Sequence, residues 1–574
     1  MSARSWRAGA FAGAFGGASL LLLGSVSCRT GLTPAVPRLD SVTATPAAPP
    51  VAPPVAPPVA PPVAPRPETV PRPVASSPAA KAAPSPLASA DAPPLLREFR
   101  GVWVATVGNM DWPSARTLSV AEQQAELRTL FDRAEALRLN AVIFQVRPAA
   151  DALYKSSIEP WSEFLTGGQG QAPSPAWDPL AFAIEEAHAR GMELHAWFNP
   201  YRAGFVHGRS AAAASHIRRT NPSLVKKYGS YWWMDPGEAA VRARTVRVIV
   251  DVVKRYDVDG VHLDDYFYPY PENDRRGRPL PFPDAASWKK YRARGGALSR
   301  DDWRRENVNT LVRELDAAIH SAKPHVRFGI SPFGIWRPGY PASVRGFDAY
   351  QKIYADARKW LREGWVDYFT PQLYWPTTKV GQAYPVLLDW WATENIMQRH
   401  LWPGNYSSRA GLPGAAAFPV SDLVEQIRLT RLQPGASGNV HFSMTSFLKN
   451  QAGMNDTLLV GPYATVALPP ATPWLKAPPP PTPALRLTRE AGATTLRFTP
   501  KGRTAPWQWV VRLRTDTAWI TMILRGTTTQ WPIPNGVVPT KVTVSALNRV
   551  GTESTPVSLP IVTRPTTAPT GRFQ

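Results

Sequence analysis

The stretch that decides the fold is Asp259-Gly-Val-His-Leu-Asp-Asp-Tyr-Phe-Tyr-Pro269. Side chains alternate between the two faces of a β-strand, so Val261 and Leu263 share one face, while His262 and Asp264 share the other. A short strand with one apolar face and a carboxylate at its C-terminal end is typical of a (β/α)₈ barrel, whose active site forms at that end. We therefore expect His262 and Asp264 to point into a barrel.

Outward from this stretch, short β-rich runs alternate with amphipathic runs, as parallel α/β folds require. The predicted strands are residues 100–106, 141–146, 193–198, 260–266, 327–332, 366–374, 400–407 and 439–446. The predicted helices are residues 120–138, 179–190, 236–256, 300–322, 350–363, 384–394 and 420–431. This pattern predicts the α/β class and, within it, a (β/α)₈ TIM barrel.

Polar and aromatic residues gather where the predicted strands end. The alternation of side chains makes the following residues point inward or lie in the next loop: Gln145, Arg147, Asp151, Trp197, Asn199, Tyr201, Arg202, Ser331, Gln372, Tyr374 and Trp375. Together they predict an aromatic-walled, hydrogen-bonding cleft suited to sugar hydroxyls.

Hydrolysis of a glycosidic bond normally needs two carboxyl groups, one protonated and one ionised. Asp264 is the first candidate, because a carboxylate at a strand end is costly unless it is hydrogen-bonded or takes part in chemistry. Asp265 is the favoured second candidate, and Asp235 and Glu306 remain open. A purely structural role in the barrel mouth is the alternative for both members of the Asp264–Asp265 pair.

A metal site is the other reading of His262, Asp264 and Asp265, whose side chains could ligate a cation. No spaced partner motif such as His-Glu-x-x-His accompanies them. We therefore expect neither a metal nor another cofactor.

The N-terminal residues 1–28 have the pattern of a lipoprotein signal peptide, with a basic start, an apolar middle and small residues before Cys28. Ser25-Val26-Ser27-Cys28 resembles a lipobox, so lipidation is expected at Cys28, the single cysteine. Residues 29–94 form a Pro-rich linker typical of an extended stalk. The sequence thus predicts an exported protein, anchored by lipid to a membrane in the periplasm or cell envelope.

The rest of the chain divides by composition into a barrel over residues 95–467, a second Pro-rich linker over 468–483, a β-rich domain over 484–564 and a tail over 565–574. Short predicted strands at 484–487, 494–498, 508–514, 517–525 and 542–548 indicate a fibronectin type III-like β-sandwich. That domain could dock on the barrel, act as a spacer or bind glycan.

The chain is strongly basic, with a formal charge of +22, of which +18 lies after residue 94. A positive field attracts polyanions. Nothing in the sequence resembles a nucleic-acid-binding module, which leaves an acidic glycan or cell wall as the candidate polyanion. A general basic bias without a specific partner is the alternative. A monomer is expected.

Five motifs occur in order: Arg100-Gly-Val-Trp-Val, Gln145-Val-Arg-Pro148, Trp197-Phe-Asn-Pro-Tyr-Arg202, Asp259–Pro269 and Asp367-Tyr-Phe-Thr-Pro-Gln-Leu-Tyr-Trp-Pro376. Over about residues 96–465 they resemble glycosyl hydrolase-like family 10, which has divisome-localised lipoprotein members. The resemblance implies a barrel related to the α-amylase and other retaining glycosidase barrels. It also implies action on peptidoglycan glycan strands that have lost their stem peptides.

The Gly260-to-Asp264 spacing is similar to the fourth strand of the amylase-like barrels, where the Asp is the nucleophile, whereas the amylase-type Glu after the fifth strand is missing. The leading hypothesis is hydrolysis of β-1,4 links in cell-wall glycan, with Asp264 as nucleophile or electrostatic stabiliser and Asp265 or another mouth carboxylate as acid/base. In that hypothesis the sugar is positioned by Arg147, Asn199, Arg202, Gln372 and Tyr374. Two alternatives stay open: hydrolysis of another extracellular polysaccharide, and a non-catalytic glycan-binding scaffold.

Overall fold

The computed structural model describes residues 92–414, 417–490, 493–502, 505–534 and 536–561. The predicted signal peptide, its Cys28 and nearly all of the first Pro-rich linker lie outside these residues, as does the tail predicted at 565–574.

The central element is a parallel sheet of nine strands in the order β11-β10-β9-β8-β4-β3-β2-β13-β12. Its strands are β2 (Phe99–Val104), β3 (Ala141–Arg147), β4 (Glu193–Phe198), β8 (Gly260–Leu263), β9 (Arg327–Ile330), β10 (Tyr368–Phe369), β11 (His400–Leu401), β12 (Gly404–Asn405) and β13 (Gly438–His441). Only Trp402 and Pro403 separate β11 from β12, yet β11 pairs with β10 and β12 pairs with β13. One segment therefore joins both ends of the sheet, which closes as a barrel with eight strand positions. The predicted fold class is confirmed.

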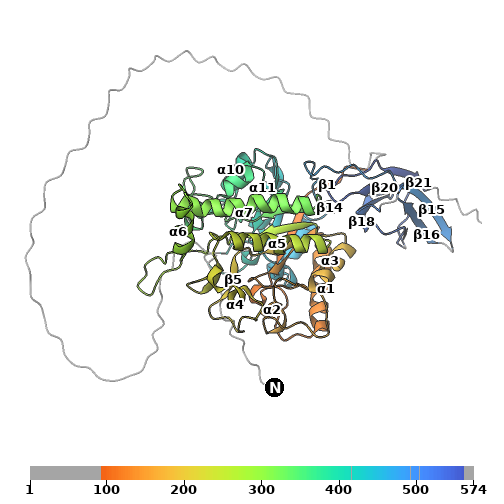
Figure 1. Cartoon of the computed structure of the whole chain (residues 1–574). Coiled ribbons are helices and arrows are strands. Elements are labelled where there is room, and N and C mark those ends of the chain that lie inside the picture. The colour runs from red at the N-terminus through yellow and green to blue at the C-terminus, as the bar shows by residue number, and fades with distance from the viewer. Residues whose placement is uncertain (1–91, 415–416, 491–492, 503–504, 535, 562–574) are drawn as a thin grey trace, which may run out of the picture. The chain divides into compact units, whose positions relative to one another are not determined.

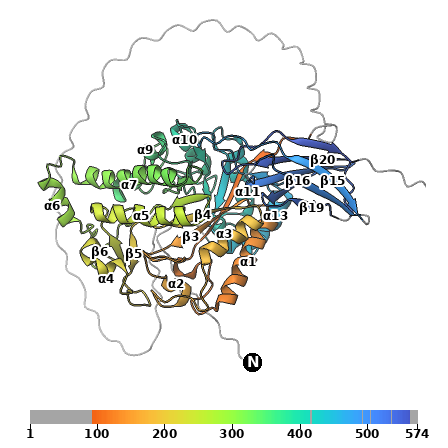
Figure 2. The ribbon, with the colours of Figure 1, turned by 45° about the vertical axis from the view of Figure 1, so that its right-hand side comes forward.

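Helices cover the outside of these strands (Figure 1). Those that follow barrel strands are α1 (Val120–Ala136), α3 (Pro179–Ala189), α5 (Ala239–Arg255), α7 (Arg300–Ala322), α10 (Tyr384–Glu394) and α11 (Val420–Leu432). Ser119 begins α1 with a reciprocal capping box to Glu122, which satisfies N–H groups that the first turn leaves open. Figures 1 and 2 both show α5 and α7 side by side against the strands around β8.

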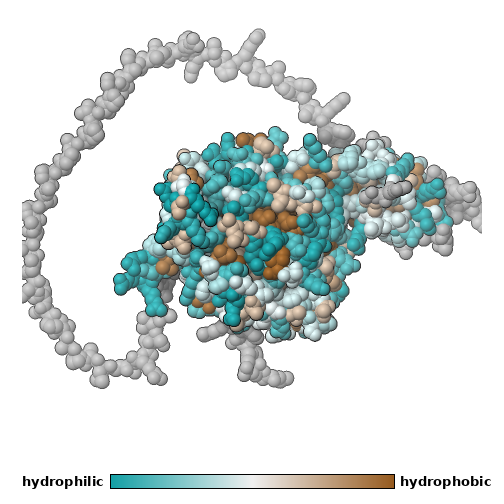
Figure 3. All heavy atoms as spheres, in the orientation of Figure 1, coloured by the Kyte–Doolittle hydropathy of each residue, from teal (hydrophilic) through white to brown (hydrophobic). Residues whose placement is uncertain are grey.

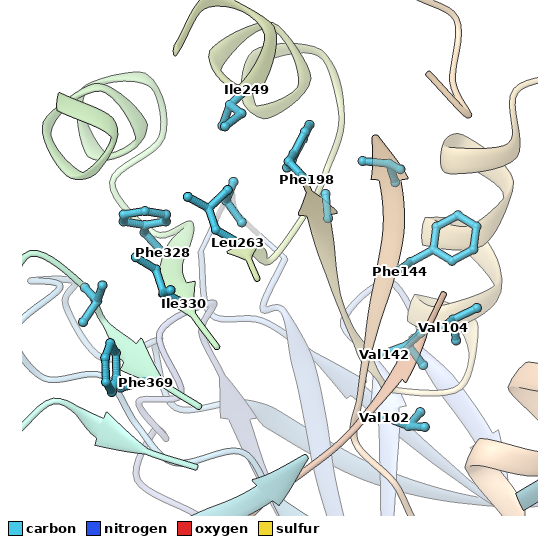
Figure 4. Packing of buried hydrophobic residues seen from close by; sticks show 14 of the residues in the cluster. Val102, Val104, Val142, Phe144, Phe198, Ile249, Leu263, Phe328, Ile330 and Phe369 are labelled. Carbon is cyan, nitrogen blue, oxygen red and sulfur yellow. The ribbon is translucent and has the colours of Figure 1, made fainter. Parts of the chain in front are cut away.

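The main core lies between the strands and the helices. Figure 4 shows the outward side chains of successive strands, among them Phe198, Leu263 and Phe328, pointing toward the helices, with Ile249 of α5 facing them. Burying each such side chain stabilises the fold by about 1.5–3 kcal/mol. Val261 and Leu263 thus face the helices, as the alternation of β8 predicts, and its intervening residues face the barrel interior.

A second, smaller apolar cluster fills the inside of the barrel. Phe99 stacks on Trp402 at a ring-centroid distance of 3.7 Å, and Tyr368 stacks on the same indole at 4.8 Å. The interior is therefore a packed floor beneath the strand ends.

Besides shifts of one to three residues at the ends of others, four predicted elements differ from the observed ones. The strand predicted at 400–407 is split into β11 and β12 around Trp402 and Pro403. The helix predicted at 350–363 is two short helices, α8 (Ala349–Lys352) and α9 (Ala357–Arg362), because the chain between them bends with Tyr354 at a positive φ of 56°. The strand predicted at 366–374 shortens to β10, although Gln372 still bridges Phe333 and Gly404. The strand predicted at 439–446 ends at His441, and α12 (Met444–Leu448) follows it.

An antiparallel sheet, ordered β5-β7-β6, was not predicted and lies between β4 and α5. Its strands are β5 (Arg202–Phe205), β6 (Val225–Tyr228) and β7 (Tyr231–Met234). The remaining helices before residue 462 are α2 (Glu163–Thr166), α4 (Ile217–Thr220), α6 (Ala285–Ala293), α13 (Met454–Val460) and the 3₁₀ turns Val107–Asn109, Pro222–Leu224, Ser407–Arg409 and Gln451–Gly453.

The C-terminal region forms two antiparallel sheets, β15-β16-β19 and β18-β17-β20-β21. Their strands are β15 (Ala484–Glu490), β16 (Ala493–Thr499), β17 (Gln508–Arg514), β18 (Trp519–Arg525), β19 (Gln530–Pro532), β20 (Lys541–Leu547) and β21 (Val557–Pro560). Phe498, Trp509 and Val544 belong to the apolar cluster of this region, as expected for a small β-sandwich.

The C-terminal sheets contact the barrel at the ends where its strands begin. The Gln508 side chain donates to the Gly191 carbonyl, just before β4, at 2.9 Å. Arg549 pairs with Asp259, just before β8, at 2.7 Å. The short parallel pair of β1 (Leu96–Arg97) and β14 (Ala467–Leu468) lies at the two ends of the barrel segment. The carboxyl ends of the strands are therefore opposite these contacts.

The surface is mostly hydrophilic in the view of Figure 3, with hydrophobic residues gathered over α5 and α7. Val246 and Val250 of α5 and Ala318 of α7 line a shallow groove there. Within the part of the chain that the structure describes, no helix has both the length and the apolar character needed to cross a membrane.

Candidate active site

Two consecutive carboxylates follow β8 at the carboxyl end of the barrel. Asp264 is 3% exposed and Asp265 is 1% exposed. Asp264 accepts a hydrogen bond from the Asn199 side-chain amide, and the Tyr266 backbone N–H lies 3.5 Å from its other oxygen. Asp265 accepts from the Tyr270 hydroxyl through one oxygen, while its other oxygen has no partner among the described residues.

The surroundings of this pair favour the protonated form. Burial raises the pKa of Asp264 to about 7, and the negative charge of Asp265 adds to the effect. Burial also raises the pKa of Asp265 to about 6, although the Tyr270 hydroxyl works in the opposite direction. The pair titrates as a unit and therefore holds about one proton close to neutral pH.

A chain of amides fixes the donor that faces Asp264. The backbone N–H groups of Thr106 and Val107 donate to the Gln145 side-chain oxygen at 2.9 and 2.8 Å. The Gln145 side-chain N–H₂ must then face the Asn199 oxygen, 2.7 Å away. Since this settles which end of the Asn199 amide is oxygen, its N–H₂ group faces Asp264.

Arg202 brings the nearest positive charge. Its Nη2 donates to the Asn199 oxygen at 2.8 Å, its Nε donates to the Pro148 carbonyl at 2.9 Å, and its guanidinium lies 5.1 Å from the Tyr266 ring centre. This charge lowers the pKa of both Asp264 and Asp265, and so partly offsets the effect of burial.

Arg147 lies deeper and contacts protein groups instead of open space. It is fully buried, with Nε and Nη2 paired to the Glu159 carboxylate at 2.7 and 2.6 Å. Its Nη1 donates to the Asn199 carbonyl at 2.6 Å. All three nitrogens thus bond to protein, so Arg147 holds the loop that carries Asn199 and does not reach a sugar.

Asp151, which the sequence also predicts as a sugar contact, is 1% exposed and accepts from the Ala149 backbone N–H at 2.9 Å. The Gln169 side-chain amide lies 3.5 Å from its other oxygen. Its position makes it a support for the loop after β3. Burial raises the pKa of Asp151 to about 6.

His262 lies on the floor of the site. The Trp103 indole N–H, which can only donate, points at His262 Nε2 at 3.1 Å, so the ring proton sits on Nδ1 and faces the Tyr368 hydroxyl at 3.1 Å. Ser331 is within 3.0 Å of Nε2. Burial lowers the pKa of His262 well below its usual range, so this side chain is neutral. The fully buried ring supports the site from below and is not placed to touch substrate.

The neighbouring inward residue on β4, Trp197, is 6% exposed, and its ring lies 6.4 Å from the His262 ring. Gln372 donates to the Ser331 carbonyl at 3.0 Å. The Tyr374 ring packs at a tilt against the Tyr406 ring, 4.7 Å away, and Trp375 packs edge-on against Phe333 at 5.7 Å. The charges of Asp264 and Asp265 contribute to the pKa of Tyr374, which burial raises well above its usual range, so this ring lies close to the pair.

Three aromatic residues of the site went unassigned in the sequence. Tyr266 belongs to the stretch that also carries the carboxylates and Tyr270 directly follows it, so their proximity to that pair was the available signal. Tyr406 follows β12, and no pattern in the sequence links it to Tyr374.

The other candidate carboxylates lie elsewhere. Asp235 accepts from the Ser287 hydroxyl at 2.7 Å and from the Gly237 backbone N–H at 2.9 Å. Glu306 hydrogen-bonds within α7, to Asn309 and Thr310. Of the candidates, only Asp265 is brought beside Asp264. No group of three or more His, Cys, Asp or Glu side chains among the described residues could hold a metal ion.

Comparisons with known proteins agree on the chemical class. The family model described as glycosyl hydrolase-like 10 matches residues 98–412. Glycosyl hydrolase YngK of Bacillus subtilis is 43% identical over 389 residues, which cover 66% of this chain and 74% of that protein. Glycosyl hydrolase DigH of Escherichia coli strain K12 is 35% identical over 378 residues, which cover 60% of this chain and 82% of that protein.

Among solved structures, the catalytic domain of β-amylase from Paenibacillus polymyxa aligns with a TM-score of 0.45 and 11% identity. The alignment covers 65% of this chain and 100% of that one. This level of likeness adds nothing to the pairing of the strands, which defines the barrel by itself.

Proposed function

Because this chain belongs to the glycosyl hydrolase-like 10 family and is a glycoside hydrolase, we propose that it cleaves peptidoglycan glycan strands lacking stem peptides, with Asp264 and Asp265 as its catalytic carboxyl groups. The observation that carries this proposal is the pair of adjacent buried carboxyl groups at the end of β8, where burial raises the pKa of both. One protonated and one ionised carboxyl group are what glycoside hydrolysis requires.

The two carboxylates receive different roles from their partners. Asp264 has an N–H donor facing each oxygen, which suits the ionised member once a substrate N–H adds a further donor; in the protein alone its pKa, about 7, is the higher of the two, against about 6 for Asp265. Asp265 has a donor on one oxygen only, which leaves the other able to carry a proton for the leaving group. In this assignment Asp265 is the acid/base and Asp264 is the nucleophile or stabiliser.

The proposed polymer also fits the charge and the aromatic surroundings. Residues after 94 carry +18 of the formal charge, which attracts the lactyl carboxylates of muramic acid. Tyr266, Tyr374 and Trp375 are half-buried at these strand ends, and their rings are the proposed contacts for sugar C–H groups. Gln372 and Arg202 each donate one N–H to Ser331 and Asn199, so their remaining N–H groups are the proposed donors to the sugar.

We further propose that Cys28 anchors the enzyme by lipid in the cell envelope, where this polymer lies. Metabolic labelling with a radioactive fatty acid should mark the wild type and leave Cys28→Ser unlabelled. Labelling of the Ser variant to the same level would rule out lipidation at this residue.

The test of function is digestion of purified glycan strands whose stem peptides have been removed. Wild type should release soluble fragments, and Asp264→Asn should lower the rate by about 10³-fold or more, because one carboxylate of the pair is lost. Asp235→Asn is the matched control, since Asp235 is also a buried aspartate but lies outside the pair, and it should keep near-normal activity.

Equal release by wild type and Asp264→Asn would remove Asp264 from the mechanism. Parallel digestion of an α-glucan and of a bacterial exopolysaccharide tests the substrate. Turnover of either in place of the strands would reassign the polymer, and tight binding of strands without turnover would favour a scaffold role.

A further inference from the structure

Both carboxylates of the site come from one strand end as sequence neighbours. In most glycosidases the two carboxyl groups flank the scissile bond, at about 5–5.5 Å apart in retaining enzymes and about 6.5–9.5 Å apart in inverting ones. Asp264 and Asp265 both leave the chain just after Leu263, on the wall that β8 provides. A pair of this kind leaves the opposite side of the sugar ring without a carboxylate.

The other buried carboxylates near the strand ends are already engaged. Asp151 accepts from the Ala149 backbone N–H at 2.9 Å, and the Gln169 side-chain amide lies 3.5 Å from its other oxygen. Asp111 accepts from the Ala105 and Thr445 backbone N–H groups and from the Ser443 and Thr445 hydroxyls, all within 2.9 Å. Glu159 is paired with Arg147, and Glu163 is paired with Arg116 at 2.5 Å. Within the described residues, none of these groups is available as an opposing nucleophile.

We propose that the nucleophile is supplied by the substrate: the carbonyl oxygen of a 2-acetamido group on the sugar whose anomeric bond is broken, held in place by Asp264. The ligand class is thereby narrowed to glycans with an N-acetylated 2-amino sugar at the cleaved bond. This inference rests on the proposed function of the same site and adds its mechanism.

The step balances without a further reactant. The acetamido oxygen forms a bond to C1 as the C1–O bond to the leaving sugar breaks, and Asp265 gives its proton to the departing oxygen. The product is a cyclic oxazolinium ion whose N–H donates to the Asp264 carboxylate. Water then attacks C1 and gives a proton to Asp265, which regenerates the acetamido group and leaves the anomeric configuration unchanged overall.

The partners of the two carboxylates support this division of roles. The Asn199 amide, held by Gln145, and the Tyr266 backbone N–H orient Asp264 as an acceptor. An acetamido N–H would become one more donor to that carboxylate, and so would favour its ionised form. The proton of the pair then resides on Asp265, whose second oxygen has no partner.

The test varies the nucleophilicity of the acetamido oxygen while the enzyme stays intact. Peptide-free strands are de-N-acetylated and then re-acylated with acetyl, difluoroacetyl or trifluoroacetyl groups. Each fluorine withdraws electron density from the carbonyl, so the full-length wild type should cleave trifluoroacetylated strands about 10²-fold more slowly, or worse, than acetylated ones. In Asp235→Asn the cleavage rate should fall with each added fluorine as steeply as in the wild type. In Asp264→Asn the rate should depend less steeply on the number of fluorine atoms.

Equal rates across the acyl series would overturn the inference and leave the proposed function standing, as would a glycosyl ester on Asp264 in the mass spectrum of enzyme quenched during turnover. A product of inverted anomeric configuration would also overturn it. Failure of the wild type to cleave even the acetylated strands would instead remove the proposed function, and this inference with it.

Discussion

The two ends of strand β8 carry buried aspartates with opposite electrostatic surroundings. At the start of the strand, Asp259 accepts from His188 at 2.8 Å, from Arg549 at 2.7 Å and from the Leu194 backbone N–H at 2.9 Å. Burial alone would raise its pKa, but His188 and Arg549 hold the pKa of Asp259 well below its usual range. At the other end, burial prevails and raises the pKa of both Asp264 and Asp265.

The difference separates a structural carboxylate from a reactive one. Asp259 is bonded to the Arg549 guanidinium, the His188 ring and a backbone N–H, so its charge is stabilised in the folded state and stays fixed. The pair at the far end has neutral donors and a single more distant guanidinium, so its charge is poorly stabilised and its proton can move. Burial of an acid therefore points to chemistry only where compensating charge is missing.

The largest expected effect is on catalysis. Replacement Asp265→Asn removes the proton donor and should lower kcat/KM on peptide-free strands by about 10³-fold, as is usual when a general acid is lost. The midpoint of urea unfolding should stay the same or rise at pH 8, because a poorly compensated buried charge is removed. A variant that keeps a third of wild-type activity would exclude Asp265 as the acid.

An aspartate-to-asparagine substitution at the start of β8 should have the opposite effect: it should lower stability and leave activity nearly unchanged. Asp259→Asn leaves His188 and Arg549 with the more exposed Asp257 as their only shared anion, and should lower the free energy of unfolding by about 3 kcal/mol. Activity per folded molecule should stay within about twofold, since the change is at the far end of β8. In an Arg549→Gln background, Asp259→Asn should lower the free energy of unfolding by a smaller amount. If the losses of the two single variants simply add in the double variant, the Asp259–Arg549 pair does not stabilise the fold.

A smaller effect is expected from Gln145→Met, which removes the amide that fixes Asn199. Disorder of that one donor should lower kcat by about tenfold. The acidic limb of the pH profile should move to higher pH, because a weaker donor to ionised Asp264 raises the pKa of that carboxyl group. An unchanged limb together with a changed KM would show that Gln145 acts on sugar binding instead.

The smallest effect concerns stability against pH. An aspartate with a raised folded-state pKa stabilises the fold fully below about pH 4, and this contribution is lost as pH rises through about 6 to 7. Asp259, with a lowered pKa, stabilises above about pH 4 and loses its contribution as pH falls. In urea unfolding from pH 5 to 8, the free energy of unfolding of the Asp264→Asn, Asp265→Asn double variant should increase relative to that of the wild type as pH rises. A difference in unfolding free energy that does not change with pH would contradict the raised pKa values.

The alternation of side chains along the strands made much of the fold and of the candidate site predictable from the sequence. Apolar Val261 and Leu263 imply that Asp264 faces inward, and the same reasoning brings Asn199 and Gln372 to the same end of the barrel. The bounds of α7 and α10 and the start of α1 follow from residues that favour helix ends, such as Ser119 before Glu122. These features are local, so a single sequence contains them.

Ion pairs between residues far apart in the chain could not be predicted from the sequence. Alternation places Arg147 inward but cannot say that Glu159 will take up its guanidinium, and nothing links Asp259 to an arginine 290 residues later. The break near Tyr354 was also missed, because a positive φ at a tyrosine is set by tertiary packing. Sequence patterns thus indicate which residues can lie close together, and the folded barrel determines which of them keep hydrogen-bonding groups that are not paired within the protein.

The placement of Arg549 has one more consequence. The cation that secures the base of β8 is contributed by the C-terminal sheets, whereas every side chain assigned to bond breaking belongs to the barrel. A chain shortened at residue 483 would keep its reactive groups and lose an anchor of the strand that presents them. Heat tolerance and turnover can accordingly be tuned in separate parts of the polypeptide.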